Sequence, residues 1–412
     1  MNVSTTNLQH RRRVLSLLHL LFAAAMAWAA PTEAEADSLR QRDDFVTASL
    51  LVISPGSDGY SSLGHTSLRM ECPVYGLDYV FSYTINTDST ATSYLRFLYG
   101  GTRGGLLAIK TQDYLRLTRE EGRGMTQYTL NLNPRQKQEL WRVLDDYVQR
   151  GYIWNDFFAD NCTSLCFCFI SNHLLDERLE VRAWPEVMQH GGTEAFMHYF
   201  DHTPWMQFVL LTFGGSRADE PTPIERCVAP AAIGQVLSEA VIVGPDGTER
   251  PVLLGEPRQL LPHTLTLQPV WLTPLRLAIA LLAVVVLLTL GQWLWGWRRV
   301  ALTADVALLT VQALLGVLLL CLLTIGRLFE QHWNWCLLLF SPLPLVVWVC
   351  CRRRAVYRRL ALAYGVAMLV LALAAPFVTA QLIGAHRLVA LTIAVRCLSC
   401  ALHEIKYKHQ ST

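Results

Sequence analysis

The last third of the chain contains four long runs of apolar residues that carry no charge. Their bounds are Leu277 to Trp295, Val306 to Gly326, Trp335 to Cys351 and Leu360 to Ala385. A helix needs about 20 apolar residues to cross the hydrocarbon core of a bilayer, so the first, second and fourth runs predict transmembrane helices. The third run is shorter and contains Pro342 and Pro344. Membrane helices tolerate proline where neighbouring groups satisfy the freed backbone atoms.

A fifth apolar run, from Leu388 to His403, is interrupted by Arg396. It predicts either a fifth span or an amphipathic helix that lies at the membrane interface. Residues 271–412 are therefore expected to form an all-α transmembrane domain of four or five helices. Arg298 and Arg299 follow the first span, and an arginine cluster follows the third. The positive-inside rule places these loops in the cytoplasm and residues 31–270 outside.

The N-terminus has the pattern of a secretory signal peptide. Arg11, Arg12 and Arg13 precede an apolar run that ends at Met26, and Ala-Trp-Ala-Ala follows. A basic region, a short apolar region and small residues at the end predict a signal peptide over residues 1–30, with cleavage after Ala29 or Ala30. A retained anchor helix is the alternative. In both cases the next segment starts outside the bacterial inner (cytoplasmic) membrane, which makes the expected location of the domain periplasmic.

Between residues 31 and 214 shorter patterns predict a domain that mixes strands and helices. Strands are expected at Phe45 to Ile53, Gly64 to Met70, Leu77 to Tyr83 and Thr126 to Leu132. Helices are expected at Ser93 to Leu98, after Asn133-Pro134, and from the Asp160-Asn161 pair to Leu174. The glycine-rich segment GGTRGG from Gly100 predicts a loop. Residues 215–270 are rich in proline and glycine and are interpreted as an appendage and linker, with a hairpin at residues 241–254.

Composition narrows the function classes. Hydrophobic residues make up 52% of the 412 residues and charged residues 17%, and 35 basic residues nearly balance 33 acidic ones. A net charge of +2 gives no electrostatic case for nucleic acid. The apolar runs exclude a purely cytosolic globular enzyme. No feature of the sequence fixes the oligomeric state.

Cys162 is the first candidate for chemistry. Asp160 or Asn161 would cap the helix that follows, which places Cys162 in its first turn. The positive end of the helix dipole favours the thiolate there, and the free backbone amides can bind an oxyanion. The alternative is a structural cysteine or a disulfide partner, since Cys166 and Cys168 follow and the outward cysteines are odd in number.

His65 is the candidate base for this thiol. It follows Gly64 at the start of a predicted strand, just after a polar turn. A histidine on a strand that faces a cysteine on a helix is a papain-type arrangement, here with the histidine first in the chain. His173 lies about three helical turns from Cys162, too far to reach it. The sequence has no HExxH motif and no CxxC pair, so neither a metal nor another cofactor is expected.

Four motifs resemble, in order and spacing, the outward domain of the Lnb-type lipoprotein N-acyltransferases. They are SPGSDGYSSLGHTSLRM (Ser54 to Met70), LDYVFSY (Leu77 to Tyr83), EGRGMTQYTLNLNPRQK (Glu121 to Lys137) and YIWNDFFADNCTSL (Tyr152 to Leu165). The resemblance covers about residues 46–270. The multi-span region, with HWNWCLLLFSPLPLV from His332, looks like the membrane part of the longer members.

The resemblance implies an α+β, permuted papain-like thiol-enzyme domain, akin to the LRAT and NlpC-like folds. His65 matches the GH histidine of the family and Cys162 its DNC cysteine. Four further residues match neighbouring motif positions with a supporting or oxyanion role, namely Asn161, Asp160, Ser54 and Arg69. The chain departs from the family at TSLCFCF, where members usually have an arginine-rich stretch, and at Thr84, where glycine is common.

The implied activity is transfer of an ester-linked acyl chain from the diacylglycerol of a lipoprotein to the amine of its first cysteine, through an acyl-thioester. The implied partners are diacylated lipoproteins and membrane lipid. Two other classes stay open on the residues alone. One is an exported thiol amidase or peptidase that acts on cell-wall peptides, and the other is a non-enzymatic membrane assembly factor, which needs no free thiol.

Overall fold

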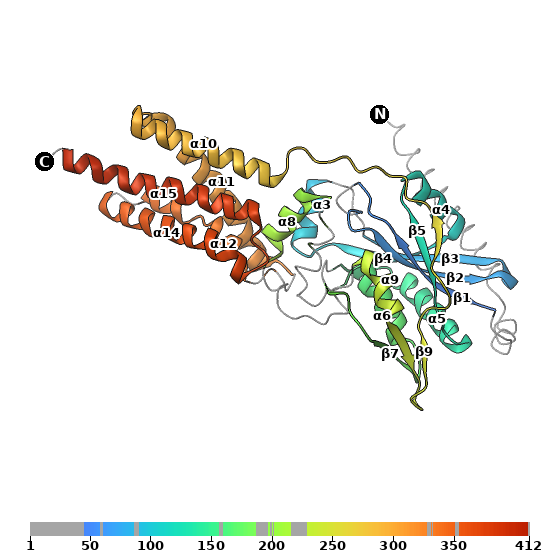
Figure 1. Ribbon diagram of the computed structural model, residues 1–412. Coiled ribbons are helices and arrows are strands. Elements are labelled where there is room, and N and C mark those ends of the chain that lie inside the picture. Colours follow the sequence, from blue (N-terminus) through green and yellow to red (C-terminus); the bar gives the residue numbers. More distant parts are fainter. Residues whose placement is uncertain are drawn as a thin grey trace, which may run out of the picture. The chain divides into compact units, whose positions relative to one another are not determined.

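A computed structural model describes residues 45–57, 61–85, 90–155, 160–186, 197, 200, 202–215, 229–327, 331, 333–350 and 354–410. The predicted signal peptide lies outside the described residues. The described chain contains a sheet-rich N-terminal part and an all-α C-terminal part (Figure 1).

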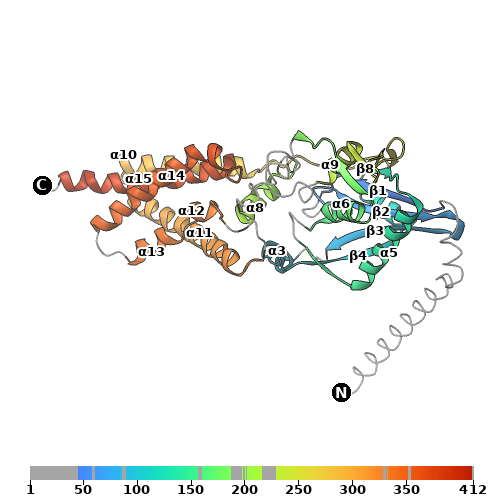
Figure 2. The same cartoon turned by 90° about the horizontal axis from the view of Figure 1, so that it is seen from below.

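The centre of the N-terminal part is a seven-stranded sheet in which each neighbouring pair is antiparallel. Its strand order is β10-β5-β1-β2-β3-β4-β6. The strands are β1 (Thr47–Ile53), β2 (His65–Cys72), β3 (Leu77–Ile85), β4 (Arg103–Lys110), β5 (Met125–Thr129), β6 (Ile153–Trp154) and β10 (Arg258–Leu261). The four predicted strands are thus confirmed as β1, β2, β3 and β5. β1 to β4 lie side by side in Figure 2.

Helices cover both faces of this sheet. Consecutive residues of β1 point to opposite faces, and burial of both residues shows that both faces are covered. Leu50 and Leu51 are each fully buried. Leu51 packs with Tyr114 of α4 (Thr111–Glu120) on one face. The other face carries α5 (Pro134–Arg150), α6 (Cys162–Asn172) and α9 (Pro230–Ser238) (Figure 1).

The helix predictions at Ser93, Pro134 and Cys162 are confirmed by α3 (Ala91–Leu98), α5 and α6. The prediction of a loop over GGTRGG is partly wrong, because β4 already begins at Arg103 and pairs with β3. The ring of Tyr83 explains why position 104 of this strand is glycine. A Cβ on Gly104 would lie 2.4 Å from Cζ of Tyr83, so only glycine leaves room for the ring.

The stretch expected to be an appendage contributes β10 to the edge of the main sheet. Its described part also contains α9 and the predicted hairpin, which is formed by β8 (Ala240–Val243) and β9 (Glu249–Pro251). With β7 (Arg178–Val181), these strands form a second, three-stranded sheet in the order β7-β8-β9. Elsewhere in the described residues of the N-terminal part lie the 3₁₀ helix η1 (Pro73–Tyr75) and α8 (Pro204–Gly214).

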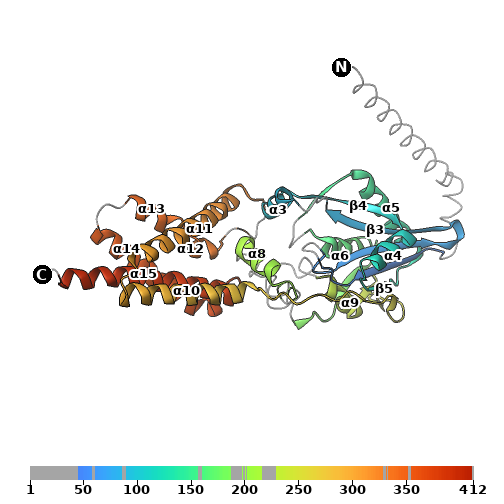
Figure 3. The same ribbon diagram turned by 90° about the horizontal axis from the view of Figure 1, so that it is seen from above.

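Four described helices of the C-terminal part are long and apolar enough to cross a membrane. They are α10 (Pro274–Leu294), α11 (Arg298–Ile325), most of α14 (Arg354–Val378) and the first part of α15 (Gly384–Gln410). α10 runs alongside α15 (Figure 3). The uncertain fifth run is thus a long apolar helix, and Arg396 lies buried inside it. Its guanidinium pairs with both carboxylate oxygens of Asp305, at 2.6 and 2.7 Å.

The third predicted span is instead split into α12 (Cys336–Leu339) and α13 (Leu343–Cys350). The chain between them packs tightly on α11, since a Cβ on Gly316 would lie 1.8 Å from the carbonyl oxygen of Phe340. Side chains satisfy the carbonyl groups that the break frees. Gln312 Nε2 donates to the Leu339 oxygen at 3.0 Å, and the Tyr364 hydroxyl donates to the Leu338 oxygen at 2.9 Å.

Candidate active site

The first turn of α6 is fixed by a capping box. The side-chain oxygen of Asn161 accepts hydrogen bonds from the amides of Thr163 and Ser164, at 2.9 and 3.0 Å. The Ser164 hydroxyl in turn accepts from the Asn161 amide at 3.0 Å. This reciprocal pair fixes the start of the helix at Cys162, as the sequence predicts, with Asn161 rather than Asp160 as the cap.

The same cap changes the expected oxyanion site. The amides of Thr163 and Ser164 are occupied by Asn161, so they are not free to bind a substrate oxygen. The amide of Cys162 itself is the first-turn donor that Asn161 does not occupy. Asn155 also lines the cavity, where its side-chain oxygen accepts from the Tyr83 hydroxyl at 3.4 Å. No sequence motif assigns a role to this residue.

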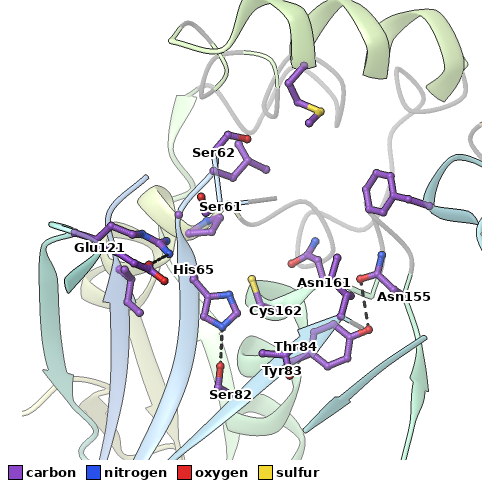
Figure 4. Close-up of a pocket in the computed structure, with 18 of the residues that line it drawn as sticks. Ser61, Ser62, His65, Ser82, Tyr83, Thr84, Glu121, Asn155, Asn161 and Cys162 are labelled. Atoms are coloured by element: carbon purple, nitrogen blue, oxygen red, sulfur yellow. Dashed lines mark hydrogen bonds and ion pairs between the residues drawn. The ribbon is translucent and has the colours of Figure 1, made fainter. Parts of the chain in front are cut away.

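Cys162 and His65 lie next to each other in one cavity (Figure 4). Cys162 has a free thiol and is half-buried. Burial raises the pKa of this thiol. The opposing effects are the positive charge and hydrogen bond of His65 and the hydrogen bonds of the Thr66 amide and the Thr163 hydroxyl. Together they lower the pKa to about 7, so much of the thiol is ionised at neutral pH.

His65 is oriented by Ser82, a residue that the sequence analysis missed. The Ser82 hydroxyl lies 2.9 Å from Nε2 of His65 and 3.4 Å from the hydroxyl of Tyr114. Strand pairing explains this contact: Ser67 pairs with Ser82, and His65 is two residues before Ser67 on the same face of β2. Because Ser82 holds Nε2, Nδ1 is the ring nitrogen left for proton exchange with the thiol.

The cavity around this pair has a volume of about 840 Å³ and a mostly apolar wall. Its apolar lining comes from the sheet, from α3 and α4, and from α8. The α8 side chains are Trp205, Met206, Val209 and Leu210. A cavity of this size and polarity suits a long hydrocarbon chain better than a peptide.

The last turn of α8 is hydrogen-bonded to the membrane part of the chain. The Leu211 carbonyl accepts from Gln381 Nε2 at 2.8 Å, and the Thr212 carbonyl accepts from Asn334 Nδ2 at 2.9 Å. The Thr212 hydroxyl lies 2.9 Å from Nε2 of His386, on α15. One wall of the cavity is therefore held by the membrane part of the chain.

The other predicted supporting residues lie away from the thiol. Asp160 is exposed and does not line the cavity, whereas Asn161 does. Arg69 also lies outside the lining and pairs with Asp78, to which its Nε and Nη2 each donate at 2.8 Å. The hydroxyl of Ser54 accepts from the Gly124 amide at 2.8 Å. Arg69 and Ser54 therefore support the sheet and its loops rather than contacting the thiol.

Together, the fold and the cavity define a membrane protein with a sheet domain that carries a free thiol beside a histidine. Residues 40–189 match the family model described as the Lnb N-terminal periplasmic domain. Residues 266–408 match the model described as the Lnb transmembrane domain. The chain belongs to the Lnb family, and its sheet domain is the extracytoplasmic one. No curated protein and no solved structure matches the chain.

Proposed function

We propose that this protein is a thiol acyltransferase of the bacterial inner membrane. It moves an ester-linked acyl chain from the diacylglycerol of a lipoprotein to the amine of the N-terminal cysteine of that lipoprotein. The observation that carries the proposal is the position of the Cys162–His65 pair. The pair lines an apolar cavity. One wall of that cavity is α8, which is hydrogen-bonded to the membrane part of the chain. The histidine-first order of the pair supports a permuted papain-like fold for the sheet domain.

The reaction has two steps. The sulfur of Cys162 attacks the ester carbonyl, and His65 accepts the thiol proton at Nδ1. The backbone amide of Cys162 donates to the oxyanion, and collapse of the oxyanion breaks the C–O bond. His65 gives its proton to the leaving alkoxide, which leaves a lyso-lipoprotein and an acyl-thioester on Cys162. The amine then attacks the thioester, His65 accepts the amine proton, and that proton returns to the departing thiolate.

The energetics of a long acyl chain favour this arrangement over a water-filled site. Moving about 14 methylenes from a bilayer into water costs roughly 11 kcal/mol, at ~0.8 kcal/mol each. An apolar cavity that is walled in part by a helix fixed to the membrane domain offsets most of this cost. A thiol amidase that acts on cell-wall peptides would use the same residues, but its hydrophilic substrate would gain little from this lining.

The proposal is tested with the purified full-length protein in lipid nanodiscs and a synthetic diacylated lipopeptide. Mass spectrometry should find an N-acylated lyso product, together with an enzyme species heavier by one acyl chain at Cys162. Release of free fatty acid without N-acylation would indicate a hydrolase instead. In cells, loss of the gene should change the acylation of lipoprotein N-termini. An unchanged acylation pattern would contradict the proposal.

A further inference from the structure

A buried arginine lines the same cavity as the thiol. Arg123 lies just before β5, in the loop that follows α4, and only 8% of its surface is exposed. It contributes to the cavity wall together with His65 and Cys162. Arginine is rarely buried to this degree unless each of its donors has a partner.

Two of the three guanidinium nitrogens of Arg123 are held in place. Nε donates to the Ser54 carbonyl at 2.8 Å, and Nη1 donates to a carboxylate oxygen of Glu121 at 3.1 Å, the dashed contact beside Glu121 in Figure 4. Nη2 is buried and has no hydrogen-bond partner within the described part of the chain. Ser54 is itself fixed by the Gly124 amide, which makes the position of the guanidinium rigid. A preorganised donor of this kind is suited to an oxygen atom of the substrate.

The charge balance around Arg123 narrows the ligand to a neutral carbonyl group. Glu121 already compensates the positive charge, so the remaining function of the guanidinium is that of one strong N–H donor. A phosphate or carboxylate would bring a second negative charge beside Glu121, whereas an ester carbonyl adds none. In a diacylglyceryl group the two ester carbonyls lie a few bonds apart. Cys162 and Arg123 line the same cavity, so a diacylglyceryl group bound there can place one carbonyl at the thiol and turn the other towards the guanidinium.

We propose that Nη2 of Arg123 binds the carbonyl oxygen of the ester that is not cleaved, and so selects diacylglyceryl donors. This inference rests on the proposed acyl transfer and deepens it. The substrate class is a neutral lipid group with two neighbouring esters. Arg123 acts here as a binding and specificity residue, because its target carbonyl does not react.

The test combines a substitution of Arg123 with the removal of one carbonyl oxygen from the substrate, as in a double-mutant cycle. The full-length protein in nanodiscs is assayed with the diacylated lipopeptide and with an analogue in which the uncleaved ester is an ether. The wild-type kcat/KM should be about 10- to 100-fold higher for the diester, as expected for a hydrogen bond from a charged donor. In Arg123→Gln and Arg123→Lys this preference should fall to within about twofold. The exposed Arg116, which pairs with Glu120 on α4, is the matched control, and Arg116→Gln should keep the full preference.

The outcomes separate this inference from the proposed function. Equal wild-type rates on the diester and the ether overturn it, and this comparison needs no variant to fold. A preference that persists in both Arg123 variants, with both rates reduced alike, also overturns it and shows that Arg123 only stabilises the loop. Acyl transfer from neither substrate would overturn the proposed function, and the inference with it.

Discussion

Cys162 and Cys166 lie one turn apart on α6, yet the structure gives their thiols opposite properties. Cys166 lies in the middle of α6 and is buried. Burial and the neighbouring Cys162 raise its pKa well above the ordinary value. Burial also raises the pKa of the half-buried Cys162, but this residue lies at the capped start of the helix beside His65, and its pKa falls to about 7. The comparison shows that an interaction partner for the thiolate, rather than membership of the helix, lowers the pKa of a thiol.

The largest expected effect separates the two thiols directly. Cys162→Ala should lower acyl transfer by at least about 1,000-fold, because it removes the sulfur that forms the thioester. Cys166→Ala should keep activity within about threefold. Product formation and the mass of the acyl-enzyme measure both. Acyl transfer that survives in Cys162→Ala would show that the nucleophile has been misassigned.

The second prediction concerns the partner of the thiolate. His65→Gln should lower acyl transfer by about 100- to 10,000-fold, as expected for loss of a general base. It should also raise the pKa of Cys162, because burial is then opposed by fewer interactions.

In the wild type, alkylation of Cys162 by iodoacetamide should rise with pH through about 7 and be roughly tenfold slower at pH 6 than at its plateau. In His65→Gln this rise should move to higher pH. Peptide mapping separates Cys162 from Cys166, and an unmoved midpoint would show that His65 does not set the thiol pKa.

Local sequence signals predicted the parts of the site that lie within one element. The helix start at Cys162, with Asp160 or Asn161 as its cap, and the strand start at His65 each depend on a few neighbouring residues, so the sequence could predict them. The role of Ser82 depends on the pairing of β2 with β3, an adjacency that no single-strand pattern contains. For a related reason, the sequence predicts more free amides at the start of α6 than the structure has. The sequence offers Asp160 or Asn161 as the cap and does not show that the chosen side chain occupies the amides of both Thr163 and Ser164.

The membrane part shows the same limit. Arg396 made the last span doubtful, because a charge in a span is costly unless it is paired. Its partner, Asp305, is 91 residues earlier in the chain. α8 is apolar on all sides, a pattern typical of a buried helix, but the pattern does not show what covers it. One of its faces lines the cavity and its end contacts the membrane helices.

The third prediction tests the residue that orients His65. Ser82→Ala should lower kcat by about tenfold with little change in KM, because the ring loses the partner of Nε2 while the substrate contacts remain. The matched control is Ser49, an equally buried strand serine that accepts from Gln127 at 3.0 Å. Ser49→Ala should lower stability but leave kcat within about twofold. Equal effects of the two variants on kcat would assign Ser82 a purely structural role.

The smallest expected effect separates the cap from the chemistry. Asn161→Ala removes two hydrogen bonds at the start of α6 and should lower the free energy of unfolding by about 1 kcal/mol. Asn133 forms the equivalent capping box on α5, so Asn133→Ala should cost a similar amount. Only Asn161→Ala should also slow alkylation of Cys162 at pH 7, by a few-fold, because the first turn that positions the thiol loosens. Denaturant unfolding and the alkylation rate measure the two effects. If both variants leave the alkylation rate unchanged, the cap contributes to the fold alone, and the low pKa of Cys162 depends on His65 and its other hydrogen-bond partners.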